Sequence, residues 1–504
     1  MNKGNICVSV CAETADEMIA KIKEAERFAD VIEVRFDCLR TNEISKVRSQ
    51  ISNLKFNKPL LATFRSQDQG GLRSQSIEQR KEFWRSGPGE FWGSDLEEDI
   101  FNASGGLANR IISKHDLVGV PADLDATYEQ LASFDADIVK LAITANDITD
   151  CLPIWKLLER AQTENKQFVP IAMGDAGKWT RILGLAHGAY MTYASLESGG
   201  ETAPGQVTAR DLVEVYRVKE LDKNTQVFGV IGDPVAQSLS PYMHNPAFAD
   251  RGVNAVFLSL LVKDLHEFMR RMVKPETREV ELNFGGFSVT MPHKQAIIPH
   301  LDAIDPTAKA IGAVNTVKFT DGKLTGYNTD AHGFITPLKA KYGDLINARV
   351  AVFGAGGAAR ACVYALKQEG ADVTVFARDA VKGKAFADEF GVTFSEISNF
   401  KSWISNLGSN FDILVDATPL GMKGPHENDA LFTADELAGL KFVYDLVTKT
   451  TNTPLIAGAK KAGIPAIGGL DMLIAQGCKQ FEIWTGLEAP AELMRDSLVA
   501  RMPK

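Results

Sequence analysis

Two lysines in the sequence stand where an amine could act on a carbonyl compound. The first, Lys140, interrupts the apolar run Ala136–Ile143, and strand alternation places its side chain on the same face as Ile138 and Ala142. If that face lines an interior, the lysine leaves water, which favours the neutral amine that attacks a ketone to form an imine. The alternative is a surface lysine that extends to solvent from a frayed strand.

A histidine and several charged residues follow neighbouring apolar runs. His115 comes shortly after the run Arg110–Ser113 and could move protons as a general base and acid, although a histidine there can equally be an ordinary loop residue. The other charged residues lie late in the second run or end the third run: Glu33, Arg35 and Arg65. Polar residues at strand ends converge in a parallel barrel, so these side chains predict a catalytic pocket.

The second lysine, Lys294, ends a strand-like segment and has an acidic partner further along the chain. Asp330 closes the arm that follows the turn at Asp321 and Gly322, so the two side chains can meet. A protonated lysine held by a carboxylate can donate a proton to an oxygen that gains charge during hydride addition. A surface ion pair is the alternative.

Two serines and a glycine turn of the C-terminal half suggest anion binding. Ser238 and Ser240 precede a helix that starts near Pro241, where they could bind a carboxylate or simply cap the helix. Further on, a strand leads into a glycine turn, a helix and a second strand, an order typical of dinucleotide binding. The turn residues are Gly354, Gly356, Gly357, Ala358 and Ala359.

The end of the second strand of this unit indicates which dinucleotide fits. Arg378, with Lys382 nearby, could pair with the 2′-phosphate of NADP, and no acid stands at the strand tip where NAD-binding folds place one. Asp379 argues in the other direction, because its carboxylate could accept a ribose hydroxyl or repel the phosphate. The balance predicts NADP.

These side chains need elements that hold them in place. Short apolar runs alternate with amphipathic stretches as far as residue 222, which is the pattern of a (β/α)8 TIM barrel. The expected strands are Ile6–Val10, Val31–Phe36, Leu60–Phe64, the weak Phe91–Leu96, Arg110–Ser113, Ile138–Leu141, Val169–Met173 and Ala189–Tyr193. Helix-like segments between them include Ala15–Phe28, Ile77–Trp84, Thr149–Asn165 and Thr208–Leu221.

The chain is therefore expected to be α/β throughout, with a barrel at 1–222 and two smaller domains after it. A substrate-binding α/β domain is predicted at 226–335 and completed by about 475–504. A Rossmann domain that binds NADP is predicted at 336–474.

Composition excludes several classes of protein. The 504 residues are 45% hydrophobic and 24% charged, and the net charge of −9 argues against nucleic acid as a partner. No apolar stretch is long enough to span a membrane and the first residues lack a signal pattern, so a cytoplasmic location is expected. The six cysteines are scattered without metal-binding spacing, which predicts no metal site. A disulfide between Cys7 and Cys11 is the pairing to consider, and a reducing compartment disfavours it.

Residues 1 to about 222 resemble the type I 3-dehydroquinate dehydratases. The resemblance rests on Glu33-Val-Arg35-Phe-Asp37, Thr63-Phe-Arg65 before Gly70-Gly71, Ser113-Lys-His115-Asp116, the Lys140 strand, Met173-Gly174, Arg181 and Ala203-Pro204-Gly205-Gln206. It implies that Lys140 forms a Schiff base with the substrate ketone, while His115 removes the adjacent carbon proton and returns it to the departing hydroxyl. It also implies further substrate-binding residues: Arg181 and Gln206 for the carboxylate and hydroxyls, and Glu33, Arg35 and Arg65 along the pocket.

One residue of this half departs from that family. Gln69 stands where the family usually has a glutamate that orients the catalytic histidine. An amide can accept an N–H from the imidazole but cannot stabilise imidazolium by charge, so the pKa of His115 is expected to be lower than in relatives. A slower dehydratase is a possible consequence.

From about Val227 to its end, the chain resembles shikimate dehydrogenase. Further matching motifs are Gly312-Ala-Val-Asn315-Thr, Asp416-Ala-Thr418-Pro-Leu-Gly-Met422 and Gly468-Gly-Leu-Asp-Met-Leu-Ile-Ala-Gln476. The resemblance implies that Lys294 and Asp330 are the catalytic pair and that Ser238 and Ser240 bind a carboxylate. It implies binding of ring hydroxyls by Thr290, Asn315 and Gln476, and a nicotinamide bordered by Thr418 and Met422. Two departures are Thr448, where many relatives have a substrate-contacting tyrosine, and Ser288, where many bacterial relatives have asparagine.

The whole arrangement resembles the fused enzymes of plants, in which Ser288 also occurs. It predicts a bifunctional enzyme of the shikimate pathway that dehydrates 3-dehydroquinate to 3-dehydroshikimate and then reduces this ketone to shikimate with NADPH. Two alternatives remain open. One is an NAD-dependent quinate or shikimate dehydrogenase with a catabolic dehydratase, and the other is a non-catalytic barrel that serves as a scaffold for an active dehydrogenase.

Overall fold

The computed structural model describes residues 2–103, 108–396, 407–449 and 452–502. Its N-terminal part is a parallel barrel whose strands follow the order β7-β6-β5-β4-β3-β2-β1-β8-β9. The backbone N–H of Tyr190 donates to the carbonyl of Phe168 at 2.9 Å, which joins the entry of β8 to the start of β7 and closes the ring. The strands are β1 (Asn5–Val10), β2 (Val31–Arg35), β3 (Leu60–Thr63), β4 (Gly93–Glu97), β5 (Arg110–His115), β6 (Ile138–Thr144), β7 (Phe168–Met173), β8 (Met191–Ser195) and the short β9 (Val207–Thr208).

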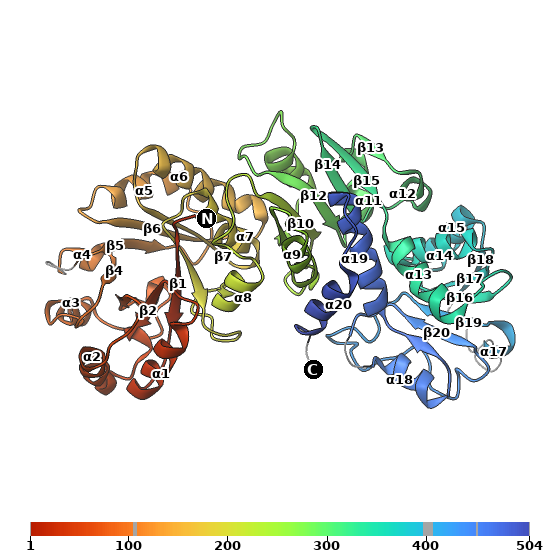
Figure 1. Cartoon of the computed structure of the whole chain (residues 1–504), viewed down its shortest axis with the longest axis horizontal. Helices are drawn as coiled ribbons and strands as arrows, with labels where there is room; N and C mark the ends of the chain where they lie inside the picture. Colours follow the sequence, from red (N-terminus) through yellow and green to blue (C-terminus); the bar gives the residue numbers. More distant parts are fainter. Residues whose placement is uncertain (1, 104–107, 397–406, 450–451, 503–504) are drawn as a thin grey trace. The chain divides into compact units, whose positions relative to one another are not determined.

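Helices surround the barrel strands (Figure 1) and bury one apolar face each. In the first of them, Met18, Ile19 and Ile22 recur at helical spacing and are buried, and the Thr14 hydroxyl accepts from the N–H of Glu17 at the start. The barrel helices are α1 (Ala15–Ala25), α2 (Ile44–Asn53), α3 (Ile77–Arg85), α4 (Glu98–Phe101), α5 (Leu124–Ala132), α6 (Leu152–Thr163), α7 (Lys178–Leu183) and α8 (Ala209–Glu214).

The predicted barrel is confirmed, and two of its strands lie further along the chain than expected. The weak run Phe91–Leu96 is β4 at Gly93–Glu97, which carries the charged residues Asp95 and Glu97 into the barrel. The last strand, expected at Ala189–Tyr193, is β8 at Met191–Ser195, so Tyr193 lies in its middle. In both cases the first two residues of the apolar run lie in irregular backbone before the strand.

The cysteine pairing differs from the one considered from the sequence. Cys11 follows β1 and Cys38 ends the 3-10 helix η1 (Phe36–Cys38) after β2, and the two form a disulfide with their Cα atoms 5.5 Å apart. Because β1 and β2 are neighbouring parallel strands, their ends lie side by side. Cys7 lies within β1, about 13 Å along the strand from position 11, which excludes a bond between Cys7 and Cys11.

The second sheet is mixed and has the strand order β11-β10-β12-β14-β15-β13. Its hairpin turns at Asp321 and Gly322, whose φ angles of 51° and 78° fit the tight turn expected from this residue pair. The strands are β10 (Gln226–Gly232), β11 (Ala255–Leu261), β12 (Phe284–Val289), β13 (Ala303–Ile304), β14 (Thr316–Thr320) and β15 (Lys323–Tyr327). Its helices are α9 (Ser240–Asp250), α10 (Leu265–Phe268), α11 (His293–Ala296), α12 (Pro306–Ile311), α19 (Gly469–Thr485) and α20 (Ala491–Val499).

The third sheet is parallel and has the order β18-β17-β16-β19-β20-β21, so the chain starts at a central strand and reverses direction once. This is the strand order of the Rossmann fold, in which ligands bind where the order reverses. The strands are β16 (Arg349–Phe353), β17 (Asp372–Ala377), β18 (Thr393–Glu396), β19 (Ile413–Asp416), β20 (Phe442–Asp445) and β21 (Ala466–Ile467). The helices are α13 (Asp330–Tyr342), α14 (Gly357–Gln368), α15 (Ala380–Phe390), α17 (Leu407–Asn410) and α18 (Pro454–Lys461).

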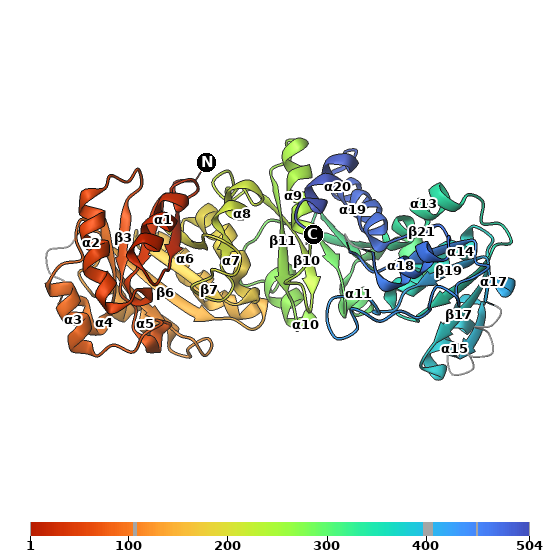
Figure 2. The ribbon, with the colours of Figure 1, turned by 90° about the horizontal axis from the view of Figure 1, so that it is seen from below.

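Compact packing divides the chain into two units, one built around the barrel and one around most of the remaining two sheets. The turned view in Figure 2 shows α19 and α20 beside α9, against which both helices pack. Within the described ranges, no helix has the length and apolar character needed to cross a membrane. The same residues contain no group of His, Cys, Asp and Glu side chains arranged to hold a metal ion.

Candidate active sites

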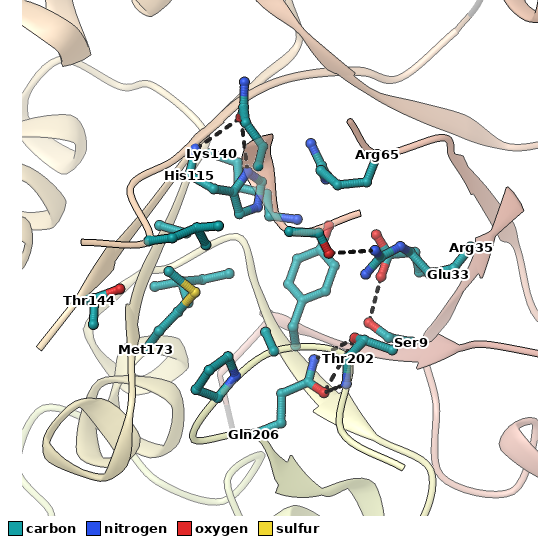
Figure 3. A pocket seen from close by; sticks show the side chains of 18 of the residues that line it. Ser9, Glu33, Arg35, Arg65, His115, Lys140, Thr144, Met173, Thr202 and Gln206 are labelled. Carbon is teal, nitrogen blue, oxygen red and sulfur yellow. Dashed lines mark hydrogen bonds between the residues drawn. The ribbon is translucent and has the colours of Figure 1, made fainter. Parts of the chain in front are cut away.

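A cavity of about 350 Å³ opens in the barrel, at the carboxyl ends of its strands. It brings together all seven residues that the sequence placed in one pocket, from strands, loops and the helix α7. Figure 3 labels all of them except Arg181. These residues are Glu33, Arg35, Arg65, His115, Lys140, Arg181 and Gln206. A cavity of this size suits a small molecule and is too small for a polymer.

Lys140 lies inside the barrel and not among the helices. Its residue is 3% exposed, and it shares the interior face with Ile138 and Ala142, which belong to the apolar cluster beneath it. The amine has two neighbours: Nζ donates to Oδ2 of Asp95 at 2.7 Å and lies 3.8 Å from the ring centroid of Tyr193. The lysine is thus buried, as expected, but it has a carboxylate partner that sequence reasoning missed.

Asp95 is shared between two cations. Its Oδ1 pairs with the guanidinium of Arg65 at 2.8 Å and accepts from the hydroxyl of Ser113 at 2.5 Å, while Oδ2 pairs with Lys140. Burial alone would raise the pKa of Asp95, but Arg65 and Lys140 outweigh it and hold that pKa well below its usual range. Asp95 is therefore an ionised carboxylate that holds the cations of Arg65 and Lys140 at the base of the cavity.

His115 is held by the residue that departs from the family pattern. Oε1 of Gln69 accepts from the backbone N–H of His115 at 3.1 Å and lies 3.3 Å from its Nδ1. With a proton on Nδ1 in this contact, Nε2 is the nitrogen that can accept a proton. Burial, followed by the charges of Arg65 and Lys140, lowers the pKa of His115 well below its usual value. The imidazole is accordingly neutral at physiological pH.

Glu33 and Arg35 form the opposite wall of the cavity (Figure 3). Glu33 accepts from the hydroxyls of Ser9 at 2.5 Å and Thr63 at 2.8 Å. Arg35 pairs with Asp37 through two hydrogen bonds of 2.8 Å. Burial acts to raise the pKa of Asp37, yet the charge of Arg35 outweighs it and the pKa lies below its ordinary value.

Arg181 differs from the other arginines of the cavity because no carboxylate pairs with it in the described part of the chain. It is 2% exposed, and its guanidinium donates to two backbone carbonyls, those of Tyr193 at 3.3 Å and Pro204 at 3.5 Å. Burial lowers its pKa to about 10. A buried guanidinium of this kind is prepared to receive an anion from outside the protein. Gln206 lines the cavity nearby, with its amide bonded to Thr202.

The predicted lysine–aspartate pair of the second unit is formed. Nζ of Lys294, in α11, contacts Oδ2 of Asp330, the first residue of α13, at 2.5 Å. The other oxygen of Asp330 accepts from the side-chain amide of Asn315 at 2.8 Å. That amide also contacts Thr329, whose hydroxyl lies 3.4 Å from the amide oxygen of Gln476 in α19. One hydrogen-bonded chain thus connects four of the predicted residues.

Ser238 lies in the loop between β10 and α9, Ser240 is the first residue of α9, and Thr290 follows β12. All three lie outside the hydrogen-bonded chain around Asp330. The hydroxyl of Ser238 accepts from the N–H of Ser240 at 3.3 Å, and neither serine caps α9, whose N-cap residue is Leu239. Thr290 donates its backbone N–H to the carbonyl of Ile231 at 3.0 Å. Ser288 donates to the side chain of Gln480 at 2.9 Å, and Thr448 lies half-buried after β20.

The glycine turn between β16 and α14 leaves room for a ligand. Gly354 has a φ of +114°, and a Cβ there would lie 2.9 Å from the carbonyl of Ala417. A Cβ on Gly356 would meet nothing within 4 Å, so its lack of a side chain is not explained by packing. No side chain caps α14, which leaves its first N–H groups available to a phosphate. Gly357 lies beside Lys294, and Ala358 and Ala359 continue the helix.

The end of β17 supports a phosphorylated ribose. Arg378 and Lys382 are exposed at the start of α15. Asp379, which left the choice of dinucleotide open, is the N-cap of that helix: its Oδ1 accepts from the N–H of Lys382 at 3.0 Å. This role gives the carboxylate a structural function, and its charge lies 3.7 Å from the ammonium of Lys382. Thr418 follows β19 with its N–H bonded to Asp416, and Met422 in the same loop is 52% exposed.

Family models match most of the chain. A model described as type I 3-dehydroquinase matches residues 6–223. Three further models match the remainder: the shikimate dehydrogenase substrate-binding domain at 230–317, shikimate/quinate 5-dehydrogenase at 337–421 and the shikimate 5′-dehydrogenase C-terminal domain at 469–499.

Individual relatives show the same two parts. The chloroplastic bifunctional 3-dehydroquinate dehydratase/shikimate dehydrogenase of Arabidopsis thaliana is 32% identical over 98% of this chain and 84% of its own length. Shikimate dehydrogenase (NADP(+)) of Methanopyrus kandleri is 40% identical over 56% of this chain and 98% of its own length. A crystal structure of shikimate dehydrogenase in complex with NADP+ covers 56% of this chain and 98% of its own, with 36% identity and a TM-score of 0.51.

Proposed function

Because this chain belongs to the family of bifunctional 3-dehydroquinate dehydratases/shikimate dehydrogenases, we propose that it carries out both reactions. The barrel dehydrates 3-dehydroquinate to 3-dehydroshikimate, and the second unit reduces this ketone to shikimate with NADPH. The observation that carries the proposal is the buried amine of Lys140, which shares one small cavity with His115 and with Arg181, an arginine that has no carboxylate partner among the described residues.

In the barrel, the Lys140 amine attacks the substrate ketone, and loss of water gives a protonated imine. The C=N⁺ group withdraws electrons from the adjacent carbon, so the neutral imidazole of His115 can remove its proton and leave an enamine. His115 then returns the proton to the departing hydroxyl, which leaves as water. Hydrolysis of the remaining imine consumes one water, releases 3-dehydroshikimate and restores the amine of Lys140.

Substrate orientation follows from the charges along the cavity. Arg181 receives the substrate carboxylate, because its buried guanidinium has no carboxylate partner in the described residues. The ring hydroxyls face Gln206, Glu33, Arg35 and Arg65, which line the same cavity. Positive charge near Lys140 and a lowered pKa of His115 keep the imidazole in the neutral form that a base requires.

In the second unit, Lys294 donates a proton to the oxygen of the ketone as this oxygen gains charge, and Asp330 holds the ammonium in place. Asn315 and Gln476, connected to Asp330 through Thr329, bind ring hydroxyls together with Thr290, while Ser238 and Ser240 bind the carboxylate. The glycine turn, α14, Arg378 and Lys382 hold NADPH, with Thr418 and Met422 beside the nicotinamide. The cofactor supplies the hydride.

One experiment tests both sites in the same chain. The protein is incubated with 3-dehydroquinate and NADPH, and cofactor oxidation is followed in wild type, Lys140→Ala and Lys294→Ala. Lys140→Ala should leave 3-dehydroquinate unchanged but still reduce added 3-dehydroshikimate. Lys294→Ala should accumulate 3-dehydroshikimate, with its reduction slowed by roughly 10²–10⁴-fold.

Surface ion pairs supply matched controls. Lys46 pairs with Glu43 in the barrel unit and Lys339 pairs with Glu369 in the second unit, each at the surface. Alanine at either position should leave both rates unchanged. Dehydration by Lys140→Ala at the wild-type rate would contradict the barrel mechanism, and a preference for NAD and quinate over NADP and shikimate would contradict the biosynthetic direction.

A further inference from the structure

The amine of Lys140 lies against the face of an aromatic ring. Tyr193, in the middle of β8, lines the cavity and is 3% exposed. The Lys140 Nζ lies 3.8 Å from the centroid of its ring, well within the reach of about 6 Å at which a cation is attracted to a π-face. The nitrogen therefore has two neighbours of complementary charge: the Asp95 carboxylate and this ring.

The Asp95 carboxylate does not interact with Lys140 alone. Asp95 also binds Arg65 at 2.8 Å and accepts from Ser113 at 2.5 Å, so its negative charge is shared between two cations and a hydroxyl. The ring of Tyr193 makes no such competing contact with Arg65 or Ser113 among the described side chains. In a site removed from water, a ring face attracts a cation more strongly than it does at the surface.

We infer that Tyr193 is a positioning residue of the dehydratase, whose ring face stabilises the positive charge that develops on the Lys140 nitrogen when the neutral amine becomes a protonated imine. The inference rests on the imine of the proposed function. A protonated imine keeps one N–H, which Asp95 can accept as it accepts the one hydrogen bond that Nζ donates among the described residues. Attraction to a ring face needs no N–H, so it adds to that contact.

The phenol hydroxyl is not required for this role. Burial, followed by the nearby Cys7, Asp95 and Glu33, raises the pKa of Tyr193 well above its usual value, so the side chain stays neutral. A neutral phenol presents the same kind of ring face as phenylalanine. The aromatic face, and not an acid or base, is what the Lys140 nitrogen contacts.

Substitutions that change the ring face without changing its shape test the inference in the full chain. Phenylalanine is placed at position 193, followed by phenylalanines with one, two and three ring fluorines, which withdraw electrons and weaken the π-face stepwise at nearly constant volume. Tyr193→Leu removes the face. Two quantities are measured with 3-dehydroquinate: the rate of borohydride trapping on Lys140 and the kcat and KM of dehydration.

The expected result is graded. Tyr193→Phe should react within about twofold of wild type, each added fluorine should lower trapping and kcat, and Tyr193→Leu should fall about five- to thirtyfold below Tyr193→Phe. KM should change less than kcat, because the charge develops after substrate binds. Reduction of added 3-dehydroshikimate by the same proteins checks that the second unit is folded, and circular dichroism with thermal unfolding checks the barrel.

Two outcomes would overturn the inference. If fluorination has no effect while leucine does, the ring only fills space; if leucine equals phenylalanine, the ring is irrelevant. Both leave the imine itself intact, since trapping on Lys140 still occurs. Absence of any adduct in the wild-type protein would instead refute the proposed function.

Discussion

A single amide contacts the histidine in the barrel. Gln69 contacts both the backbone N–H and Nδ1 of His115, and a glutamate there would add a negative charge beside the same nitrogen. Imidazolium would gain stability, so the pKa of His115 would rise from its lowered value. A base must be neutral to accept a proton. The acid limb of the dehydratase pH profile is therefore expected to move up by roughly one to two pH units in Gln69→Glu.

The measurement is kcat/KM for 3-dehydroquinate across the acid range, with Lys140 and the reductase site unchanged. Gln69→Ala is the matched control: it removes the contact without adding charge, so it should lower the rate without moving the limb upward. Superimposed acid limbs for wild type and Gln69→Glu would show that position 69 does not govern the proton on His115.

Residue types at strand ends were enough to place the cavity, but not the contacts inside it. Lys140 and His115 follow from their positions on apolar runs. Asp95 and Tyr193 do not, because their partners depend on which strands lie opposite across the barrel. Alternation along Ser94, Asp95 and Glu97 was an available signal, since two acids on one face of a strand need cations nearby. The disulfide between Cys11 and Cys38 was not predicted for the same reason, because it joins the ends of neighbouring strands and not residues close in sequence.

Two glycines in the turn between β16 and α14 have different roles. At Gly354 the backbone needs a residue without a side chain, since φ is +114° and a Cβ would approach the Ala417 carbonyl to 2.9 Å. Gly354→Ala should therefore destabilise the second unit by at least about 1–2 kcal/mol. At Gly356 nothing in the protein occupies the space. Gly356→Ala should keep the melting temperature but weaken NADPH binding roughly tenfold, or about 1.4 kcal/mol.

Calorimetry and cofactor fluorescence titration distinguish the two variants. A Gly356→Ala protein that melts early, or one that binds NADPH normally, would contradict a turn shaped for the cofactor. The sequence predicted this turn because the glycines stand between a strand signal and a helix signal and a second strand follows. The helix cap made by Asp379 was harder to foresee, since an acid after a strand can serve either a ribose or a helix.

At the scale of the whole molecule, two carboxyl groups of the third sheet make the stability of the fold depend on pH in opposite directions. Asp416 and Asp445 are register partners at the ends of β19 and β20, each 1% exposed. Burial raises the pKa of Asp416 to about 7. The folded state then binds more protons than the unfolded state between about pH 4 and pH 7, so stability falls as pH rises through that window. Asp416→Asn should raise the stability of the second unit at pH 8 by at most about 4 kcal/mol, and less at pH 5.

Asp412, one strand length away, gives a control of opposite sign. Its hydrogen bonds to Arg349 hold its pKa below the ordinary value, so its contribution is present at neutral pH and lost in acid. Asp412→Asn should lower stability at pH 8. The check is thermal unfolding of both variants at pH 5 and pH 8. Asp412→Asn should shift stability almost equally at the two pH values, because the Asp412 carboxyl is ionised at both of them whether the chain is folded or unfolded. An equal shift for Asp416→Asn would mean that the Asp416 carboxyl does not titrate in this window.

The order of domains could be predicted at this scale because each part repeats a simple pattern. Eight apolar runs indicate a barrel, and strand, glycine turn and helix indicate the Rossmann sheet. The mixed sheet between them was less determined, because a short strand such as β13 pairs with β15 and not with the strand that follows it in sequence. Packing between such segments, and not local propensity, fixes their boundaries.

Arg181 carries one more consequence. The buried guanidinium of Arg181 has no carboxylate partner in the described residues, and its burial costs free energy until an anion binds. The enzyme without substrate should therefore bind small oxyanions, which stabilise the folded barrel. Phosphate, sulfate and citrate should raise the melting temperature of the barrel and compete with substrate, whereas chloride at the same ionic strength should do so less. Arg181→Gln should abolish the difference. Kinetic constants for this enzyme will therefore depend on the choice of buffer salt.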